Sequence, residues 1–138
     1  MTISTTQPRP QLTRRELLFT LWVFVMFLYG YCDILGLFDP TVLNKLMTGT
    51  IDGIVMSETF LLAAAVLMIL PISMVLLTRV LSLRWARIGN IAVGSLKTVV
   101  MIATLMTPCT LYYWLFAMIE IPTTIAIVWL AWTWRVEG

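Results

Sequence analysis

The sequence contains no histidine and few charged residues, and both shortages limit what the chain can do. Only 12% of its 138 residues are charged, whereas 60% are hydrophobic, and the mean hydropathy is +0.95. Soluble domains carry about 25% charged residues, so this composition is typical of a membrane protein. Without histidine, the chain lacks the usual general base and the ligand that bis-histidine haem and most zinc or copper sites require. We therefore expect neither a metal nor a cofactor.

No polar stretch long enough to form a second domain separates the apolar runs, so we expect one compact unit. After a cytoplasmic tail at residues 1–13, the apolar runs predict four transmembrane helices at about residues 14–35, 57–81, 88–106 and 111–135. The connections between them are short, which favours an all-α antiparallel bundle in up-down-up-down order.

The basic residues are distributed unevenly along the chain. Arginines precede the first run, separate the second from the third, and follow the fourth: Arg9, Arg14, Arg15, Arg79, Arg84, Arg87 and Arg135. Lys45 lies alone in a loop on the other side. Because basic residues are retained on the cytoplasmic side, we expect a multi-pass protein of the inner (plasma) membrane with both termini in the cytoplasm.

Cysteine is as scarce as charge, with two residues in the chain. Cys32 falls near the outer end of the first helix and Cys109 in an outer turn. Two cysteines cannot hold a metal cluster. One interpretation is a disulfide, which requires Cα atoms within about 7 Å. The other is two free thiols that pack as small apolar side chains.

The longest loop, residues 36–57, predicts a short helix of its own. Asp39 supplies an N-cap, Pro40 a first-turn proline, and Gly49 a terminator. One side of this helix is apolar and the other polar. The pattern indicates an interfacial helix, which would serve either as an anchor on the outer leaflet or as a lid over the mouth of the bundle.

The last two apolar runs meet at the turn Thr107–Thr110, and each carries one charge in its middle. Lys97 lies about a dozen residues before the turn and Glu120 about a dozen after it, so both lie roughly 17 Å from the turn, near the middle of a hydrocarbon layer about 30 Å thick. A charge at that depth costs at least a few kcal/mol. We therefore expect Lys97 and Glu120 to be interaction partners in the first place and to form a functional site in the second.

Helical spacing extends this polar region along both helices. One stripe consists of Asn90, Gly94, Lys97, Met101 and Thr104, and the other of Tyr113, Ala117, Glu120, Thr124 and Ile127. Small residues at Gly94 and Ala117 allow close approach, so the stripes are expected to face each other. Pro71 and Pro122 free backbone carbonyls at a similar depth, and these must find partners inside the protein.

Several residues are therefore candidates for a ligand or proton site. They are Lys97, Glu120, Tyr113, Asp33, Glu58, Asn90 and Thr124. One interpretation is a polar pocket at mid-depth, open to the outer face, that binds a small molecule or relays a proton. A second is a structural or accessory subunit in which the Lys97–Glu120 pair only stabilises the bundle. A third is that Lys97 snorkels outward and never meets Glu120.

For three of these candidates a structural role is the simpler interpretation. Asp33 and Glu58 are carboxylates at helix ends in the headgroup zone, and Asn90 suits a hydrogen bond between helices. A membrane enzyme or redox protein is a less favoured class, because no nucleophile–base set is recognisable. The expected partners are the lipid bilayer and a small-molecule ligand, a second copy of the chain or another membrane protein, and not nucleic acid.

Four segments together resemble an uncharacterised family of small bacterial four-helix membrane proteins, a domain of unknown function. They are Trp22 to Asp33, the Pro71 segment closed by Arg79, Arg87-x-x-Asn90, and Tyr112-Tyr113 leading to Glu120-x-Pro122. The likeness covers roughly Glu16 to Arg135 and implies a bacterial inner membrane and four helices, without an activity. Leu70 departs from it, since the family often has an acid there. A more distant DoxX-like resemblance rests on size and topology alone.

Overall fold

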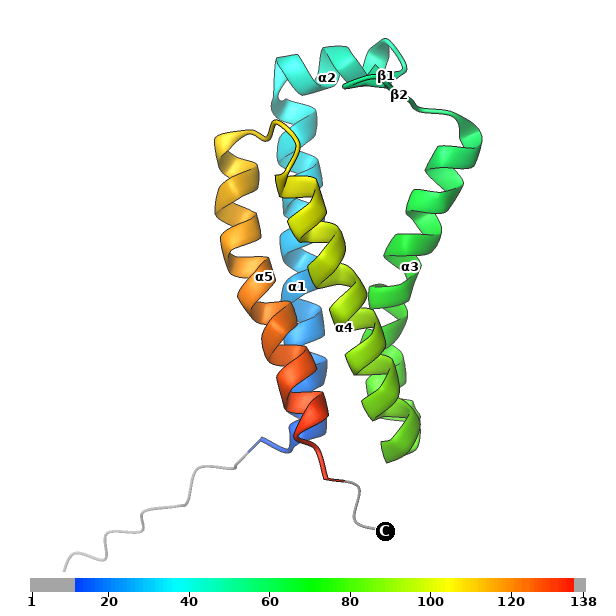
Figure 1. Ribbon diagram of the computed structural model, residues 1–138, viewed down its shortest axis with the longest axis vertical. Helices are drawn as coiled ribbons and strands as arrows, with labels where there is room; N and C mark the ends of the chain where they lie inside the picture. Colours follow the sequence, from blue (N-terminus) through cyan, green and yellow to red (C-terminus); the bar gives the residue numbers. More distant parts are fainter. Residues whose placement is uncertain (1–11, 136–138) are drawn as a thin grey trace, which may run out of the picture.

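The computed structural model describes residues 12–135; residues 1–11, most of the predicted tail, and residues 136–138 lie outside the described part. The helices are α1 (Arg14–Phe38), α2 (Pro40–Met47), α3 (Glu58–Val80), α4 (Leu83–Leu105) and α5 (Leu111–Trp132), and the strands are β1 (Thr50–Ile51) and β2 (Ile54–Val55) (Figure 1). The predicted all-α architecture with four long helices is confirmed, apart from the small β1–β2 hairpin.

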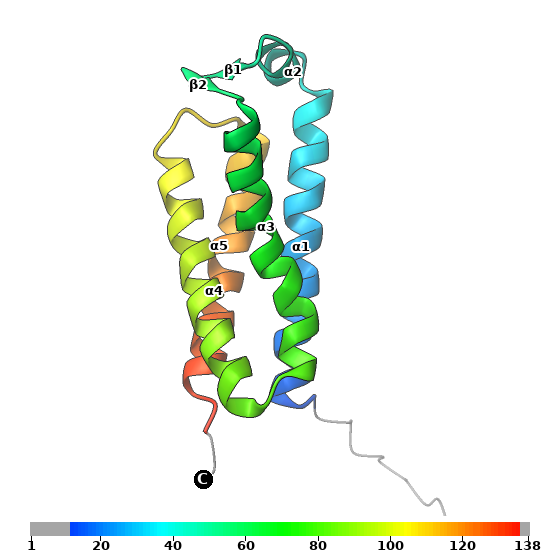
Figure 2. The same ribbon diagram turned by 90° about the vertical axis from the view of Figure 1, so that its right-hand side faces the viewer.

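The four long helices form a bundle in which sequence neighbours run in opposite directions (Figures 1 and 2). α1 packs mainly against α3 and α5, and α4 packs against the same two helices. α1 begins and α5 ends at one end of the bundle, and α2 lies across the other (Figure 1). All four helices are long and apolar enough to cross a membrane.

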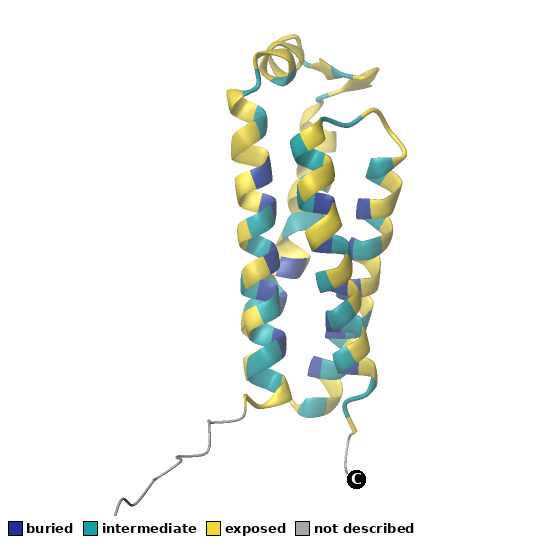
Figure 3. Ribbon diagram, turned by 90° about the vertical axis from the view of Figure 1, so that its left-hand side faces the viewer, coloured by how far each residue is buried: buried dark blue, intermediate teal, exposed yellow. Residues whose placement is uncertain are grey.

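The outside of the bundle is apolar. Figure 3 shows the buried residues on the inward faces of the helices and exposed residues along the outside. In the most apolar stretch of each long helix, between 11% and 28% of the residues are buried, and the exposed ones include Phe27, Leu62, Val99 and Trp129. Soluble monomers rarely expose so much contiguous apolar surface, so this surface suits lipid better than water.

Hydrogen bonds from side chains close the helix ends opposite α2. A capping box begins α1: the Thr13 amide donates to the Glu16 carboxylate at 2.9 Å, and the Glu16 amide donates to Thr13 Oγ1 at 3.3 Å. Arg15 donates to the carbonyls of Arg79 (2.7 Å) and Leu81 (3.0 Å) at the end of α3. A guanidinium group there also interacts favourably with the helix dipole.

Arg87 donates hydrogen bonds to the C-terminal end of α5 in the same way. Its guanidinium donates to the carbonyls of Ala131 (3.2 Å) and Trp132 (3.0 Å) in the last turn of that helix. The last four carbonyls of a helix lack a partner within it, and beyond the end of α5 the Trp134 amide also donates to the Ala131 carbonyl at 3.2 Å. Arg15 and Arg87 therefore satisfy the carbonyl ends of α3 and α5 from neighbouring helices.

The prediction that the third long helix begins at about residue 88 was wrong, because α4 begins at Leu83. Residues 83–87 contain neither proline nor glycine, and a short connection at Leu81 and Ser82 suffices to reverse the chain. Ala86 is fully buried and Arg87 reaches α5, so this first turn is held by packing that the sequence pattern did not show. The basic loop of the prediction is therefore mostly helix.

The predicted short helix in the long loop is confirmed as α2. Asp39 is its N-cap and accepts a hydrogen bond from the Thr41 amide at 2.9 Å, and Gly49 follows the helix with a φ of +73°. The β1–β2 hairpin after it was not predicted. Its turn has positive φ at both Asp52 (+48°) and Gly53 (+85°), which is the conformation that an Asp-Gly pair favours in a two-residue hairpin loop.

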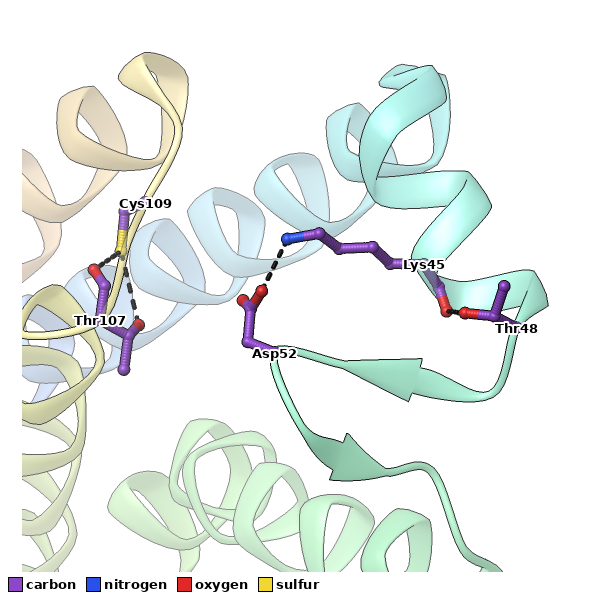
Figure 4. A network of polar contacts seen from close by, with 5 residues as sticks. All are labelled: Lys45, Thr48, Asp52, Thr107 and Cys109. Atoms are coloured by element: carbon purple, nitrogen blue, oxygen red, sulfur yellow. Dashed lines mark hydrogen bonds and ion pairs between the residues drawn. The ribbon is translucent and has the colours of Figure 1, made fainter.

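An ion pair links α2 to the hairpin at the end of the bundle that α2 covers. Lys45 Nζ on α2 lies 2.7 Å from Asp52 Oδ1 in the hairpin turn (Figure 4). The two side chains are 45% and 46% exposed, so this ion pair adds little to stability. The pair does join the turn of the hairpin to α2.

α3 differs in its two halves. Residues 58–70 include no buried side chain, whereas Pro71, Met74 and Thr78 in the other half are buried. In Figure 1 the half of α3 next to β2 leans away from the other long helices. Pro71 lies where the two halves meet, and proline is the usual cause of a bend within a helix.

Candidate functional site

The two predicted polar stripes face each other across α4 and α5. A Cβ atom added to Gly94 would lie 2.8 Å from Val128 Cγ2, so only glycine permits the observed approach. Beside it, the Thr98 hydroxyl donates to Thr124 Oγ1 at 2.8 Å. Lys97 is 5% exposed and Glu120 1% exposed. Both mid-helix charges therefore lie inside the bundle.

Lys97 and Glu120 share one cavity of about 120 Å³. It is lined by residues from all four long helices: Tyr29, Cys32, Asp33, Met68, Lys97, Val100, Met101, Thr104, Tyr113, Phe116 and Glu120. At about 30 Å³ for each water molecule, this volume corresponds to roughly four waters. The site is small and its walls combine charges, aromatic rings and thioethers.

The Lys97 ammonium does not contact the Glu120 carboxylate. Its Nζ atom lies 4.2 Å from the centroid of the Tyr29 ring and donates to Met68 Sδ at 3.5 Å. Within residues 12–135, the ion pair that is present is formed by Lys45 and Asp52, and not by Lys97 and Glu120. The expected Lys97–Glu120 pair is therefore wrong as a direct contact, because groups on α1 and α3 hold the ammonium. Lys97 does not snorkel outward either, since it is buried.

Glu120 is left without partners. Both of its carboxylate oxygens are buried and have no hydrogen-bond partner within residues 12–135, and the same is true of the Tyr29 hydroxyl. In folded proteins the large majority of buried polar atoms are hydrogen-bonded, and a buried group without a partner is costly. Glu120 thus presents two free acceptors on the wall of the cavity.

A second cavity of about 730 Å³, here called the outer cavity, lies at the end of the bundle that α2 covers. α2 and β1 contribute Thr41, Val42, Lys45, Leu46 and Ile51 to its wall. Cys32, Asp33, Thr104 and Tyr113 line both cavities. These shared residues lie between the inner cavity and the outer one, so the two cavities adjoin.

One protein-family model matches residues 10–138, nearly the whole chain. The chain belongs to DUF6326, a family of unknown function. No curated protein and no solved structure matches it. The predicted resemblance to an uncharacterised family is confirmed, and the DoxX-like alternative is not shown. Because DUF6326 brings no activity, roles for its residues must come from the geometry of this chain.

Not all of the candidate residues of this DUF6326 chain meet. Asp33 and Tyr113 line the cavity together with Lys97 and Glu120. Glu58 is exposed on the half of α3 that leans away. The Thr124 hydroxyl is used between α4 and α5. Four of the seven candidates therefore form the site.

Asn90 lies in a separate buried network near the end opposite α2. Trp22 Nε1 donates to Asn90 Oδ1 at 2.7 Å, and Asn90 Nδ2 donates to Thr78 Oγ1 at 3.1 Å and to the Ala86 carbonyl at 2.7 Å. Trp22, Thr78 and Asn90 are all fully buried. The network joins α1, α3 and α4 and leaves Asn90 no free hydrogen for a ligand.

Cys32 and Cys109 are free thiols, so the disulfide interpretation does not describe this structure. Cys32 is buried and lines both cavities, whereas Cys109 is half-buried and lines the outer one. Cys109 Sγ lies close to Thr107 in the turn between α4 and α5 (Figure 4) and donates to its carbonyl at 3.0 Å. Both thiols therefore line the outer cavity, and Cys32 lines the inner one as well.

Sequence reasoning missed four residues that line the inner cavity: Tyr29, Met68, Val100 and Phe116. Tyr29 is 5% exposed and belongs to the buried core of the bundle. A signal for this was available, because Trp22, Val25 and Tyr29 follow helical spacing. For Met68 and Phe116, which lie in continuous apolar runs, no such signal exists.

Proposed function

We propose that this chain is a multi-pass integral membrane protein of the bacterial inner membrane with both termini in the cytoplasm. Four long apolar helices support insertion. Six arginines, Arg14, Arg15, Arg79, Arg84, Arg87 and Arg135, belong to the end of the bundle where α1 begins and α5 ends. By the positive-inside rule that end faces the cytoplasm.

We further propose that the inner cavity binds or moves a small molecule or a proton. The observation that carries this proposal is the Glu120 carboxylate, which is 1% exposed and has no hydrogen-bond partner for either oxygen in the part of the chain that the structure describes. Such a group lowers the stability of the empty protein. Binding sites commonly retain groups of this kind because function needs them, at some expense of stability.

The main rival is a structural role in which Lys97 and Glu120 hold the bundle together. That role needs a direct contact, because a buried ion pair stabilises only when its geometry is good and its other hydrogen bonds are satisfied. Lys97 instead contacts Tyr29 and Met68. Within the described residues the pair thus lacks the geometry that a stabilising ion pair requires.

Thermal unfolding in detergent separates the two roles. Glu120→Gln removes the charge and keeps the shape of the side chain. A binding site predicts a melting temperature equal to or above that of the parent, because the partnerless carboxylate is gone. A stabilising pair predicts a clear fall, because Lys97 would lose its counter-charge. Glu58→Gln, a matched change at an exposed position, should leave the melting temperature unchanged.

An accessory subunit remains the second candidate function. It is favoured by the half of α3 between residues 58 and 70, which has no buried side chain and exposes Phe60, Leu61, Leu62, Val66 and Ile69. A partner membrane protein would cover this face. Tandem purification in mild detergent tests the idea, and a substitution such as Leu62→Ser should release the partner without affecting the inner cavity.

A further inference from the structure

We propose that the ligand of the inner cavity is a small cation that donates hydrogen bonds, of the class of ammonium and short primary alkylammonium ions, and that it enters from the outer cavity. This inference rests on the proposed function of the same site. It names the class of ligand, which the proposed function leaves open.

Charge is the first argument for a cation. Asp33, Lys97 and Glu120 are the ionisable acidic and basic residues of the inner cavity, and when both carboxyl groups are ionised the single ammonium leaves a net negative charge. In a site of low dielectric an uncompensated charge is costly. A monovalent cation removes that charge, whereas an anion attracted by Lys97 would face two carboxylates.

The hydrogen-bonding capacity of Glu120 also favours a cation as the ligand. A carboxylate has acceptor sites on both oxygens and no donor, and neither Glu120 oxygen is used. Lys97 already gives one hydrogen to Met68 Sδ and holds its charge against the Tyr29 ring. Within the described residues no donor reaches either Glu120 oxygen. An ammonium group with several N–H donors would satisfy both Glu120 oxygens with charge-assisted hydrogen bonds.

The walls favour an organic cation over a metal ion. Tyr29, Tyr113 and Phe116 present aromatic rings, and Met68 and Met101 present thioethers. Ring faces attract ammonium groups, whereas Na⁺, Mg²⁺ and Ca²⁺ prefer shells of oxygen ligands. Among residues 12–135 no group of three or more His, Cys, Asp or Glu is arranged to hold a metal ion.

Size limits the ligand further. Pockets for drug-sized molecules have volumes of about 300–1,000 Å³, and the inner cavity has about 120 Å³. Only a few non-hydrogen atoms fit into that space. The class is thus narrowed to ammonium and its shortest alkyl derivatives.

The outer cavity would concentrate such ions. Asp33, Asp39 and Asp52 line it, and Lys45, its one lysine, is paired with Asp52. A cleft lined by charge of one sign raises the local concentration of ions of the opposite sign. The four residues common to both cavities then lead from this acidic mouth to Glu120.

The test is thermal unfolding of the purified full-length chain in detergent at fixed pH. Ammonium chloride, methylammonium chloride, sodium chloride and sodium formate are compared at equal ionic strength. We expect ammonium or methylammonium to raise the melting temperature by a few degrees over sodium in a saturable manner. The increase should vanish in Glu120→Gln and persist in Glu58→Gln, the matched exposed control.

Three results would overturn the inference. An increase with formate would assign the site to anions, an increase that survives Glu120→Gln would place the cation elsewhere, and the absence of any increase would leave the class without support. The proposed function is judged separately, by the melting temperature of Glu120→Gln without added ligand. The proposed function therefore stands after any of the three results, provided that the melting temperature of Glu120→Gln is not below that of the parent.

Discussion

The Lys97 ammonium lies on the face of the Tyr29 ring, 4.2 Å from its centroid, and not against the Glu120 carboxylate. Lys97 and Glu120 lie at a similar depth on adjacent helices, and both line the inner cavity. Equal depth nevertheless did not produce a contact, because α1 and α3 offer the ammonium a ring and a thioether. A desolvated contact of a cation with a ring can contribute about 2 kcal/mol.

Tyr29→Leu should lower the free energy of unfolding by about 1–2 kcal/mol, because it removes the ring from under the Lys97 ammonium. Tyr29→Phe is the matched control. It keeps the ring and removes a buried hydroxyl that has no hydrogen-bond partner, so its stability should equal or exceed that of the parent. Thermal unfolding in detergent measures both. Equal losses in the two variants would show that the hydroxyl, and not the ring, is what matters.

Lys97→Met should destabilise the protein by about 1–3 kcal/mol, because Asp33 and Glu120 lose the cation in their cavity. The loss should shrink when Glu120→Gln is already present, since one of the two carboxylate charges is then gone. A double-mutant cycle on unfolding free energies measures this coupling. Additive effects would mean that the two charges do not interact across the cavity.

Gly94→Ala should destabilise the bundle by about 1–3 kcal/mol, the usual effect of overpacking. The new Cβ would lie 2.8 Å from Val128 Cγ2 and force α4 away from α5. Gly30→Ala is the control, because no atom lies within 4 Å of its Cβ position. That change should be neutral or stabilise α1 by up to about 1 kcal/mol. Similar losses at both glycines would contradict the close approach of α4 and α5.

Asn90→Leu should lower the free energy of unfolding by about 2–4 kcal/mol. It leaves Trp22 Nε1 and the Thr78 hydroxyl buried without their partner, and each such group costs about 1–3 kcal/mol. Ser95→Ala, at an exposed position of the same helix, should have little effect. The ammonium response should survive in Asn90→Leu, because the network does not line the inner cavity; its loss would link Asn90 to the ligand.

Cys109 should react with a membrane-impermeant maleimide added to the outside of intact cells. It is half-buried in the wall of the outer cavity, and in the proposed orientation that cavity faces outward. The experiment uses a Cys32→Ala background so that Cys109 is the single thiol. With Cys109→Ala added to that background, a cysteine introduced by Arg84→Cys at the opposite end of the bundle should react only after the membrane is permeabilised. The reverse pattern would invert the proposed topology.

Much of the bundle could be predicted because helical spacing is a local property of the sequence. The stripes through Lys97 and Glu120 were predicted from spacing alone, and the structure buries both residues. α2 was predicted because Asp39 and Pro40 have local capping roles that do not depend on the rest of the fold. The hairpin at Asp52 and Gly53 was equally local, and the Asp-Gly pair was the available signal.

What could not be predicted depends on how helices lean and turn relative to one another. Glu58 was expected near the site, but the bend of α3 carries it away. Lys97 was expected on Glu120, but the direction of a long side chain is decided by neighbours from other helices. Met68 reaches the cavity for the same reason. Spacing within one helix contains no information about these arrangements.

Two of the arginines from which the orientation of the chain is inferred also donate hydrogen bonds to carbonyls at helix ends. Arg15 and Arg87 belong to the basic residues from which the cytoplasmic side is inferred, and their guanidinium groups bind the last carbonyls of α3 and α5. Moving these charges to the opposite end would therefore do more than weaken a topological signal, because it would also strip two helix ends of their partners. For this chain, an evolutionary inversion in the membrane by a few charge exchanges would pass through unstable intermediates.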